Sequence, residues 1–126
     1  MSAGGEPLNS MRFRVEIDGL KAGEFFEVVF PEARIEAGRE QLTRLVLRRA
    51  ASTDRDLSEW WQQMAHGRPT PRNVAVILLD TRGQEPIRWN FVGAQPVRYS
   101  LSPLNAMEPA LLMETIELEI ENFKRG

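Results

Sequence analysis

One stretch of the sequence, Arg48 to Gly67, carries a helical pattern, and it stands alone in a chain whose other apolar residues mostly alternate. Its apolar side chains recur at i, i+3, i+4 and i+7, which places them on one face of a helix. Thr53, Asp54 and Asp56 offer oxygens that can cap the first turn. Gly67 can take the left-handed conformation that ends a helix. The apolar face consists of Leu57, Trp60, Trp61 and Met64.

Two adjacent tryptophans on one short helix require a large apolar partner, which alternating strands can supply. We interpret Trp60 and Trp61 as core anchors, and an aromatic binding box is the alternative. The complete set of core anchors that we predict is Leu57, Trp60, Trp61, Met64, Trp89, Ile116, Leu118 and Ile120.

Alternation of apolar and polar residues predicts strands through most of the remaining chain. We expect the first two strands to form a hairpin, and Gly38 to Gln41 to be a short polar connection. Gly93 and Pro96 interrupt the pattern between two later strands, and the last strand is the longest. The predicted strands are Arg12–Asp18, Glu24–Phe30, Ala33–Ala37, Leu42–Arg49, Asn73–Asp80, Pro86–Val92, Val97–Ser102 and Leu111–Phe123.

This order of strands, one helix and more strands predicts a mainly β domain. We expect an antiparallel β-sandwich or a partly open β-barrel with one flanking α-helix. The length of 126 residues suits a single domain, with residues 1–10 as a flexible N-terminal arm.

Composition excludes several classes of function. The chain has no cysteine, so disulfides, thiol nucleophiles and thiolate metal sites are excluded. The net charge of -2 gives no overall attraction to nucleic acid. The longest apolar run, Val74 to Leu79, is too short to cross a bilayer, and the N-terminus lacks a secretory pattern. We therefore expect synthesis in the cytoplasm and no membrane partner. Fourteen of the sixteen basic residues are arginines, which suits protein interfaces or reflects codon usage.

Catalytic and cofactor chemistry is sparse. His66 is the only histidine, and no nucleophile turn accompanies it. Asp54 and Asp56 lack the further ligands of a calcium loop, and no glycine-rich phosphate loop follows a strand. We expect no enzyme activity, no cofactor and no metal.

Four segments together resemble the tail-tube protein family of contractile-tailed phages, which includes the inner tubes of extracellular contractile injection systems and is akin to the type VI secretion tube. The resemblance covers Phe13 to Phe123 and rests on the ordered set, since no single motif is diagnostic. The segments are FRVEIDGLKAGEFFEV, LVLRR with DLSEWW, VILLDTRGQEPIRWNF and YSLSPLNAMEPALLMETIELEIENF.

The resemblance implies a structural subunit that forms homo-hexameric rings, stacked as an inner tube within a sheath. The implied partners are adjacent rings, sheath proteins, baseplate or spike proteins, and a cargo or DNA that passes through the lumen without sequence-specific binding. The implied location is a phage tail or a phage-tail-like particle made in the bacterial cytoplasm.

Two departures from the family pattern stand out. Relatives carry a long hairpin before the basic strand end, and residues 36–45 leave little room for it. Relatives also tend to have glycine after the basic pair, where this chain has Ala50 and Ala51. The first departure favours a specialised, baseplate-proximal ring or a compact tube variant. The candidate ring and stacking contacts are Glu36, Arg39, Glu40 and Leu42.

Two other classes of function stay open from the residues alone. The first is a small β-barrel module that binds an apolar ligand beside Trp60, Trp61 and Trp89. The second is an enzyme that uses carboxylates between Glu117 and Glu121, although such a run is usually the solvated face of a strand.

Overall fold

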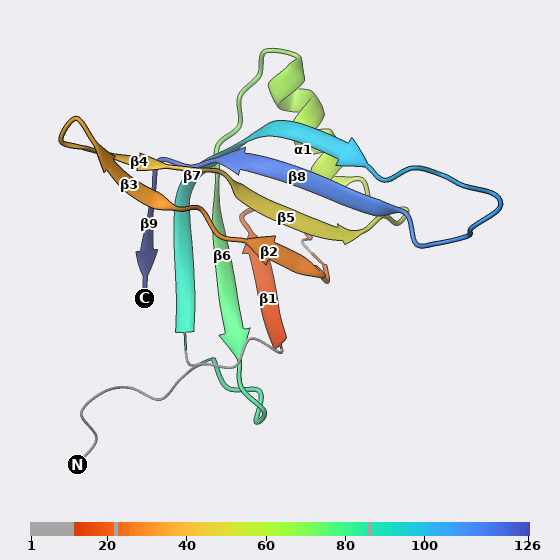
Figure 1. Cartoon of the computed structure of the whole chain (residues 1–126), viewed down its shortest axis with the longest axis horizontal. Coiled ribbons are helices and arrows are strands. Elements are labelled where there is room, and N and C mark those ends of the chain that lie inside the picture. The colour runs from red at the N-terminus through yellow and green to blue at the C-terminus, as the bar shows by residue number, and fades with distance from the viewer. Residues whose placement is uncertain (1–11, 22, 86) are drawn as a thin grey trace.

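The computed structural model describes residues 12–126 except residues 22 and 86. Within these residues the chain is mainly β, with one helix to one side (Figure 1). The elements are β1 (Arg12–Ile17), β2 (Glu27–Val29), β3 (Ala33–Glu36), β4 (Arg39–Leu42), β5 (Leu45–Ala50), α1 (Asp56–Ala65), β6 (Arg72–Leu79), β7 (Ile87–Leu101), β8 (Met113–Glu119) and β9 (Asn122–Arg125).

Seven strands form one curled antiparallel sheet, and β3 and β4 form a separate hairpin. The order in the sheet is β1–β6–β7–β8–β5–β2, and β9 also pairs with β7. In Figure 1, β1, β6 and the start of β7 run nearly perpendicular to β5 and β8, so the sheet turns sharply along its length. The predicted fold class is confirmed, and of the two expected architectures the chain adopts the open half-barrel.

The strand that connects both parts of the sheet is β7. Its first half pairs with β6 on one side and β9 on the other, and its second half pairs with β8. Gly93 has a φ of 67°, and the pairing register shifts between Pro96 and Arg98. Such bulges bend a strand without ending it. Our prediction of two strands separated at Gly93 and Pro96 is therefore wrong, because these residues bend one strand of 15 residues.

Glycine is required at position 93 for a second reason. A Cβ atom there would lie 2.7 Å from a carboxylate oxygen of Glu121, and the positive φ would strain any L side chain. The bend in β7 thus depends on a residue that the sequence presents as an interruption.

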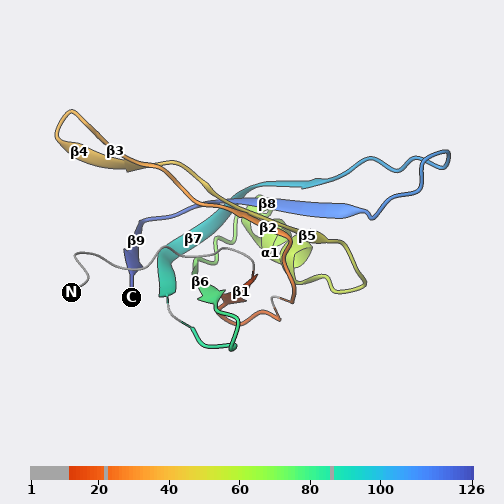
Figure 2. The same ribbon diagram turned by 60° about the horizontal axis from the view of Figure 1, so that its bottom comes forward.

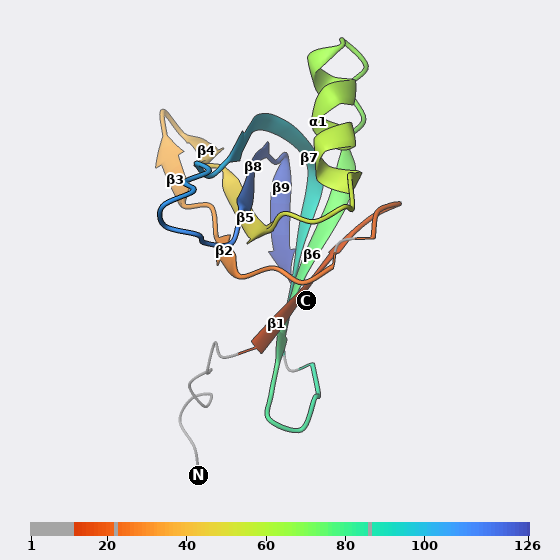
Figure 3. The same cartoon turned by 90° about the vertical axis from the view of Figure 1, so that its right-hand side faces the viewer.

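The core lies between the two parts of the sheet and under the helix (Figure 3). The strand β6 is buried at every position from Val74 to Leu78, as expected for a central strand covered on both faces. The buried core cluster is Val15, Ile17, Leu45, Leu47, Leu57, Trp60, Val74, Val76, Phe91, Ala94, Ile116 and Leu118.

The helix buries only part of its predicted apolar face. Leu57 and Trp60 are buried, whereas Trp61 and Met64 are half-buried. The Trp60 indole donates a hydrogen bond of 2.8 Å from Nε1 to the carbonyl oxygen of Thr70, so its polar atom is satisfied. Trp60 is therefore the residue that fixes the helix to the sheet.

The two ends of the helix differ from each other in how they are closed. At the C-terminus, Gly67 has a φ of 73° and its N–H donates to the carbonyl of Met64, while the N–H of Arg68 donates to that of Gln63. This glycine-terminated arrangement was predicted. At the N-terminus the cap position is Arg55, which makes no side-chain cap, so none of Thr53, Asp54 and Asp56 is the cap residue, although an Asp54 oxygen binds a first-turn N–H as predicted.

The two aspartates bind backbone N–H groups, one in the first turn of α1 and one in the segment after β1. An Asp54 carboxylate oxygen accepts the N–H of Asp56 at 2.9 Å, and Asp56 accepts the N–H of Lys21 at 2.6 Å. The pKa of Asp56 is raised by burial and by its hydrogen bond with Asp54, and backbone hydrogen bonding lowers the pKa of Asp54.

The predicted hairpin between the first two strands is wrong. The strand β1 pairs with β6, and β2 pairs with β5, so residues 18–26 cross from one part of the sheet to the other. Sequence proximity favours a hairpin, but β6, which is apolar and buried from Val74 to Leu78, needs a neighbour on each side to satisfy its backbone, and β1 provides one.

The expected polar connection at Gly38 to Gln41 is also wrong, because the chain forms a hairpin there. The strands β3 and β4 pair from Ala33 with Leu42 to Glu36 with Arg39. The two turn residues, Ala37 and Gly38, have φ values of 51° and 75°. Positive φ at both positions is the geometry of a two-residue hairpin turn. Alanine hides this turn from sequence reasoning, since asparagine or aspartate is usual there.

The predicted last strand is shorter than expected and divided. It begins at Met113 rather than Leu111, and it breaks between β8 and β9. Ile116 and Leu118 are buried as the alternation requires, and Ile120, at the break, is half-buried against the core.

Replacing Trp60 with alanine should lower the free energy of unfolding by about 3–5 kcal/mol, because the side chain is 1% exposed and fills the space between α1 and the sheet. The matched control is Trp61→Ala on the same helix, whose half-buried ring should cost clearly less. Urea unfolding of both variants measures the difference. Equal losses would contradict the assignment of Trp60 as the anchor.

Candidate assembly interface

The sheet has two open edges at the ends of a four-stranded unit. The strand β6 pairs with β7 only as far as Ala94. Residues 95–101 of β7 pair with β8 on one side, and among the described residues no strand pairs with their other side. At the other end, β2 pairs with β5 and, in the part of the chain described, with no other strand. Unpaired N–H and C=O groups along such edges are templates for another strand.

The solvent-facing side of this four-stranded unit carries charges that neutralise one another. Arg48 forms an ion pair of 2.5 Å with Glu27, and Glu117 accepts from Arg44 at 3.1 Å and from Arg98 at 3.3 Å. We call these five residues the ion-paired face. Glu117 is thus bound by arginines rather than by a second carboxylate, and the pairing needed for acid–base catalysis between Glu117 and Glu121 is not found in the described residues.

A second set of charged residues is buried on the opposite side of the same strands. Arg49 Nε donates to Glu114 at 2.8 Å, and both side chains are 5% exposed. The Tyr99 hydroxyl donates to the other oxygen of Glu114, and the Arg49 guanidinium lies 5.6 Å from the centre of the Phe25 ring. These residues connect β5, β7, β8 and the segment before β2, so the cluster fixes the register of the four-stranded unit.

Two projections extend from opposite ends of the molecule (Figures 1 and 2). One is the β3–β4 hairpin, and the other is the segment 102–112 between β7 and β8. The candidate contacts Glu36, Arg39, Glu40 and Leu42 all lie on the hairpin, where Leu42 is half-buried and the other three are exposed. The structure thus brings these four residues together on a protruding element.

The segment 102–112, which we call the β7–β8 loop, was missed as a candidate site. Leu104, Met107 and Leu111 are 84%, 88% and 68% exposed, respectively. Glu108 is the only charged residue in the loop. The signal in the sequence was this density of apolar residues in a segment too rich in proline to be a strand. Large apolar side chains exposed together indicate a contact surface.

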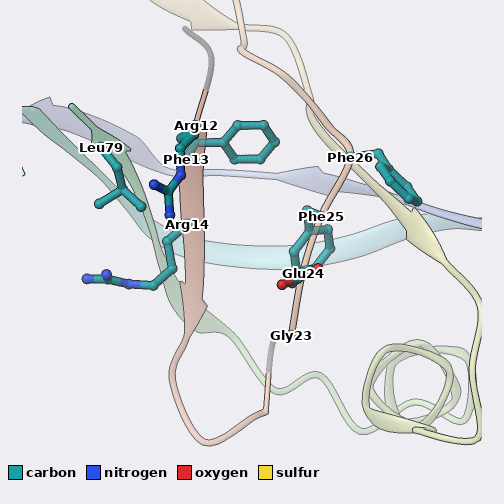
Figure 4. A pocket seen from close by; sticks show the side chains of 8 residues that line it. All are labelled: Arg12, Phe13, Arg14, Gly23, Glu24, Phe25, Phe26 and Leu79. Atoms are coloured by element: carbon teal, nitrogen blue, oxygen red, sulfur yellow. The ribbon is translucent and has the colours of Figure 1, made fainter. Parts of the chain in front are cut away.

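A pocket of about 530 Å³ lies between β1 and the segment that leads into β2 (Figure 4). Its apolar walls come from Phe13, Phe25, Phe26 and Leu79, and charged side chains stand around them. We call it the Phe-lined pocket. The complete lining is Arg12, Phe13, Arg14, Gly23, Glu24, Phe25, Phe26 and Leu79.

The tryptophans do not form the binding box considered above. Trp60 is buried and hydrogen-bonded, and Trp89 packs edge-on against Phe30 with ring centres 5.0 Å apart. The Phe-lined pocket contains none of the three tryptophans. The sequence therefore located the aromatic core but not the apolar hollow on the surface.

The described residues offer neither a metal cluster nor a membrane-spanning helix. Among the described residues, no three histidine, aspartate or glutamate side chains gather in a way that could hold a metal ion. In the same part of the chain, α1 is too short and too polar to cross a bilayer.

The chain is thus an open half-barrel with strand edges that stay unpaired among the described residues and with two projections. Residues 9–124 match the family of the T4-like virus tail tube protein gp19, and the chain belongs to this family. The resemblance drawn from the sequence segments is therefore confirmed. No curated protein matches the chain.

Solved structures from several contractile systems share the fold. A chain in the six-fold symmetrised baseplate of the anti-feeding prophage has a TM-score of 0.73 at 19% identity, covering 98% of this chain and 97% of that one. A chain in the sheath–tube complex of an extracellular contractile injection system, PVC, has a TM-score of 0.74 at 15% identity, with 95% and 91% covered. Hcp1 from Flavobacterium johnsoniae has a TM-score of 0.68 at 14% identity, with 90% and 94% covered.

The buried cluster predicts a loss of stability at alkaline pH. Burial and the hydrogen bond to Glu114 raise the pKa of Tyr99 above its usual 10.0. The folded chain keeps this proton when the unfolded chain loses it, so the free energy of unfolding should fall as the pH rises above about 10. The variant Tyr99→Phe should reduce the slope of the free energy of unfolding against pH between about pH 9 and pH 11.

Tyr99 is the only tyrosine, so the ultraviolet absorbance of its phenolate reports this group alone. We expect little phenolate in the folded protein at pH 11 and full ionisation after urea unfolding. Arg34 forms an exposed ion pair with Glu32 and supplies a control. The variant Arg34→Ala should leave the pH dependence of the free energy of unfolding unchanged. Ordinary titration of Tyr99 in the folded state would contradict the role of the cluster.

Proposed function

We propose that this chain is a structural, non-enzymatic subunit of the inner tube of a contractile tail or injection system. Six copies form a ring, and rings stack within a sheath. The observation that carries the proposal is the four-stranded unit β2–β5–β8–β7 with an open edge at each end. Membership of the tail tube family supports it.

Strand directions are compatible with a closed ring. Neighbours in the unit are antiparallel at β2–β5, β5–β8 and β8–β7, so β2 and β7 run in opposite directions. When a cyclic axis repeats the unit, β7 of one copy meets β2 of the next in an antiparallel orientation. Six copies then give one barrel of about 24 strands, and closure removes every edge of these units.

The ion-paired face is the side of this barrel that we assign to the lumen. The opposite face holds the core and the helix, so it is already covered. On the ion-paired face each of the three arginines is bound by one of two carboxylates. A wall whose arginines are held by its own carboxylates has little free charge with which to hold DNA or another cargo.

Partners outside the ring follow from the same proposal. Adjacent rings, a sheath and a baseplate or spike are the contacts that an inner tube makes, and similar folds occur in a sheath–tube complex and a baseplate. We place the finished protein in a phage tail or phage-tail-like particle, with synthesis in the bacterial cytoplasm.

A specialised baseplate-proximal ring is the second candidate position. Its motive was the short connection expected at residues 36–45, and the β3–β4 hairpin removes that motive. We propose this hairpin as the element that reaches an adjacent ring. Its apolar contact is Ile35, which is 80% exposed.

Electron microscopy and native mass spectrometry of the purified chain test the proposal, with six-fold rings and stacks as the expected result. Ile35→Asp should leave the rings intact and shorten the stacks, because a charge replaces the exposed apolar contact. Gln41→Asp is the matched control, at an exposed position of the same hairpin. A chain that stays monomeric at every concentration would contradict the proposed function.

A further inference from the structure

Within the part of the chain that the structure describes, the β7–β8 loop has no apolar partner that explains its composition. Leu104 and Met107 are among the most exposed apolar side chains described, and the loop extends away from the sheet (Figure 2). An Asn105 side-chain oxygen accepts the N–H of Met107 at 2.9 Å, which fixes the turn that presents Met107. The loop is therefore built to display apolar side chains.

The Phe-lined pocket has the complementary chemistry. Of its aromatic walls, Phe26 is 61% exposed, whereas Phe13 and Phe25 are half-buried against the core (Figure 4). On its rim, Arg14 is bound by Glu16 and Glu85, whereas Arg12 forms no ion pair within the described residues. The pocket thus offers apolar surface together with a cation, and the loop offers apolar side chains together with the carboxylate of Glu108.

Strand polarity brings these two surfaces together between copies. In the proposed ring, β7 of one copy lies antiparallel to β2 of the next, so the C-terminal end of β7 lies beside the N-terminal end of β2. The β7–β8 loop leaves β7 at Leu101, and the pocket segment 23–26 enters β2 at Glu27. The loop of one copy and the pocket of its neighbour therefore continue the same edge-to-edge contact.

We propose that the β7–β8 loop inserts Leu104 and Met107 into the Phe-lined pocket of the neighbouring copy, with Glu108 paired to Arg12. The occupant is a second copy of this chain, and the inference rests on the proposed ring. The contact would lock each copy to the next at one end of the shared edge, where backbone pairing alone leaves the strands free to slip.

Disulfide trapping tests this contact directly, because the chain has no cysteine of its own. We expect Met107→Cys combined with Glu24→Cys to give, on oxidation, a ladder of linked chains up to the hexamer. The control pair Met107→Cys and Gln62→Cys, with the second cysteine on the exposed side of α1, should give no ladder. A disulfide between the two cysteines of one chain would overturn the proposal. So would a ladder from the pair Leu8→Cys and Glu24→Cys, because the N-terminal segment would then be the occupant of the pocket.

Charge reversal gives an independent test. Arg12→Glu and Glu108→Arg should each raise the concentration needed for ring formation by about fivefold, the effect of one partly exposed ion pair. The double variant should recover the original value, and Arg82→Glu, in the exposed turn after β6, should have no effect. Thermal melts of each variant establish that the subunit remains folded.

The outcomes separate this contact from the ring itself. Six-fold rings that give no Met107–Glu24 ladder, and no response to charge reversal, would overturn the loop contact and leave the proposed function intact. Wild-type protein without rings would overturn both.

Discussion

Backbone hydrogen bonding along β7 is the constraint on which the structure depends. This strand is shared by β6, β8 and β9, and it turns at Gly93 so that its two halves belong to differently oriented parts of the sheet. Because β6 leaves it after Ala94, the second half has no pairing partner on one side of its backbone among the described residues. The bend that encloses the core therefore also creates the edge through which the chain can assemble.

The buried cluster of Arg49, Glu114 and Tyr99 shows how the four-stranded unit is held in one register. Burying a charged pair stabilises a fold little compared with apolar packing, but a mismatched register would leave each charge without its partner. A slip by one residue would also move Leu47 and Ile116 out of the core. Charge and packing thus specify the same alignment, which a subunit needs if its edges are to meet those of identical copies.

The two faces of the same strands have different tasks. Towards the core they carry apolar side chains and the buried cluster, and towards solvent they carry the ion-paired face. The exposed pairs contribute little to stability, so their value lies in leaving a surface with little net charge. Most of the exposed apolar residues lie instead outside this face, on the hairpin, on the β7–β8 loop and next to β2, although Val29 is on the same side of β2 as Glu27.

The sequence by itself determined the mainly β class, the helix with its glycine end, the burial of Trp60, Ile116 and Leu118, and the family. The class, the helix and the burial depend on local periodicity, which a single chain records directly, whereas the family rests on the resemblance of four segments taken in order. Only the tertiary structure decided that β1 pairs with β6, that Gly93 bends a strand instead of ending it, and that residues 33–42 form a hairpin. It also decided where the Phe-lined pocket lies, because pairing partners and hollows depend on contacts between segments far apart in the chain, and periodicity carries no information about them.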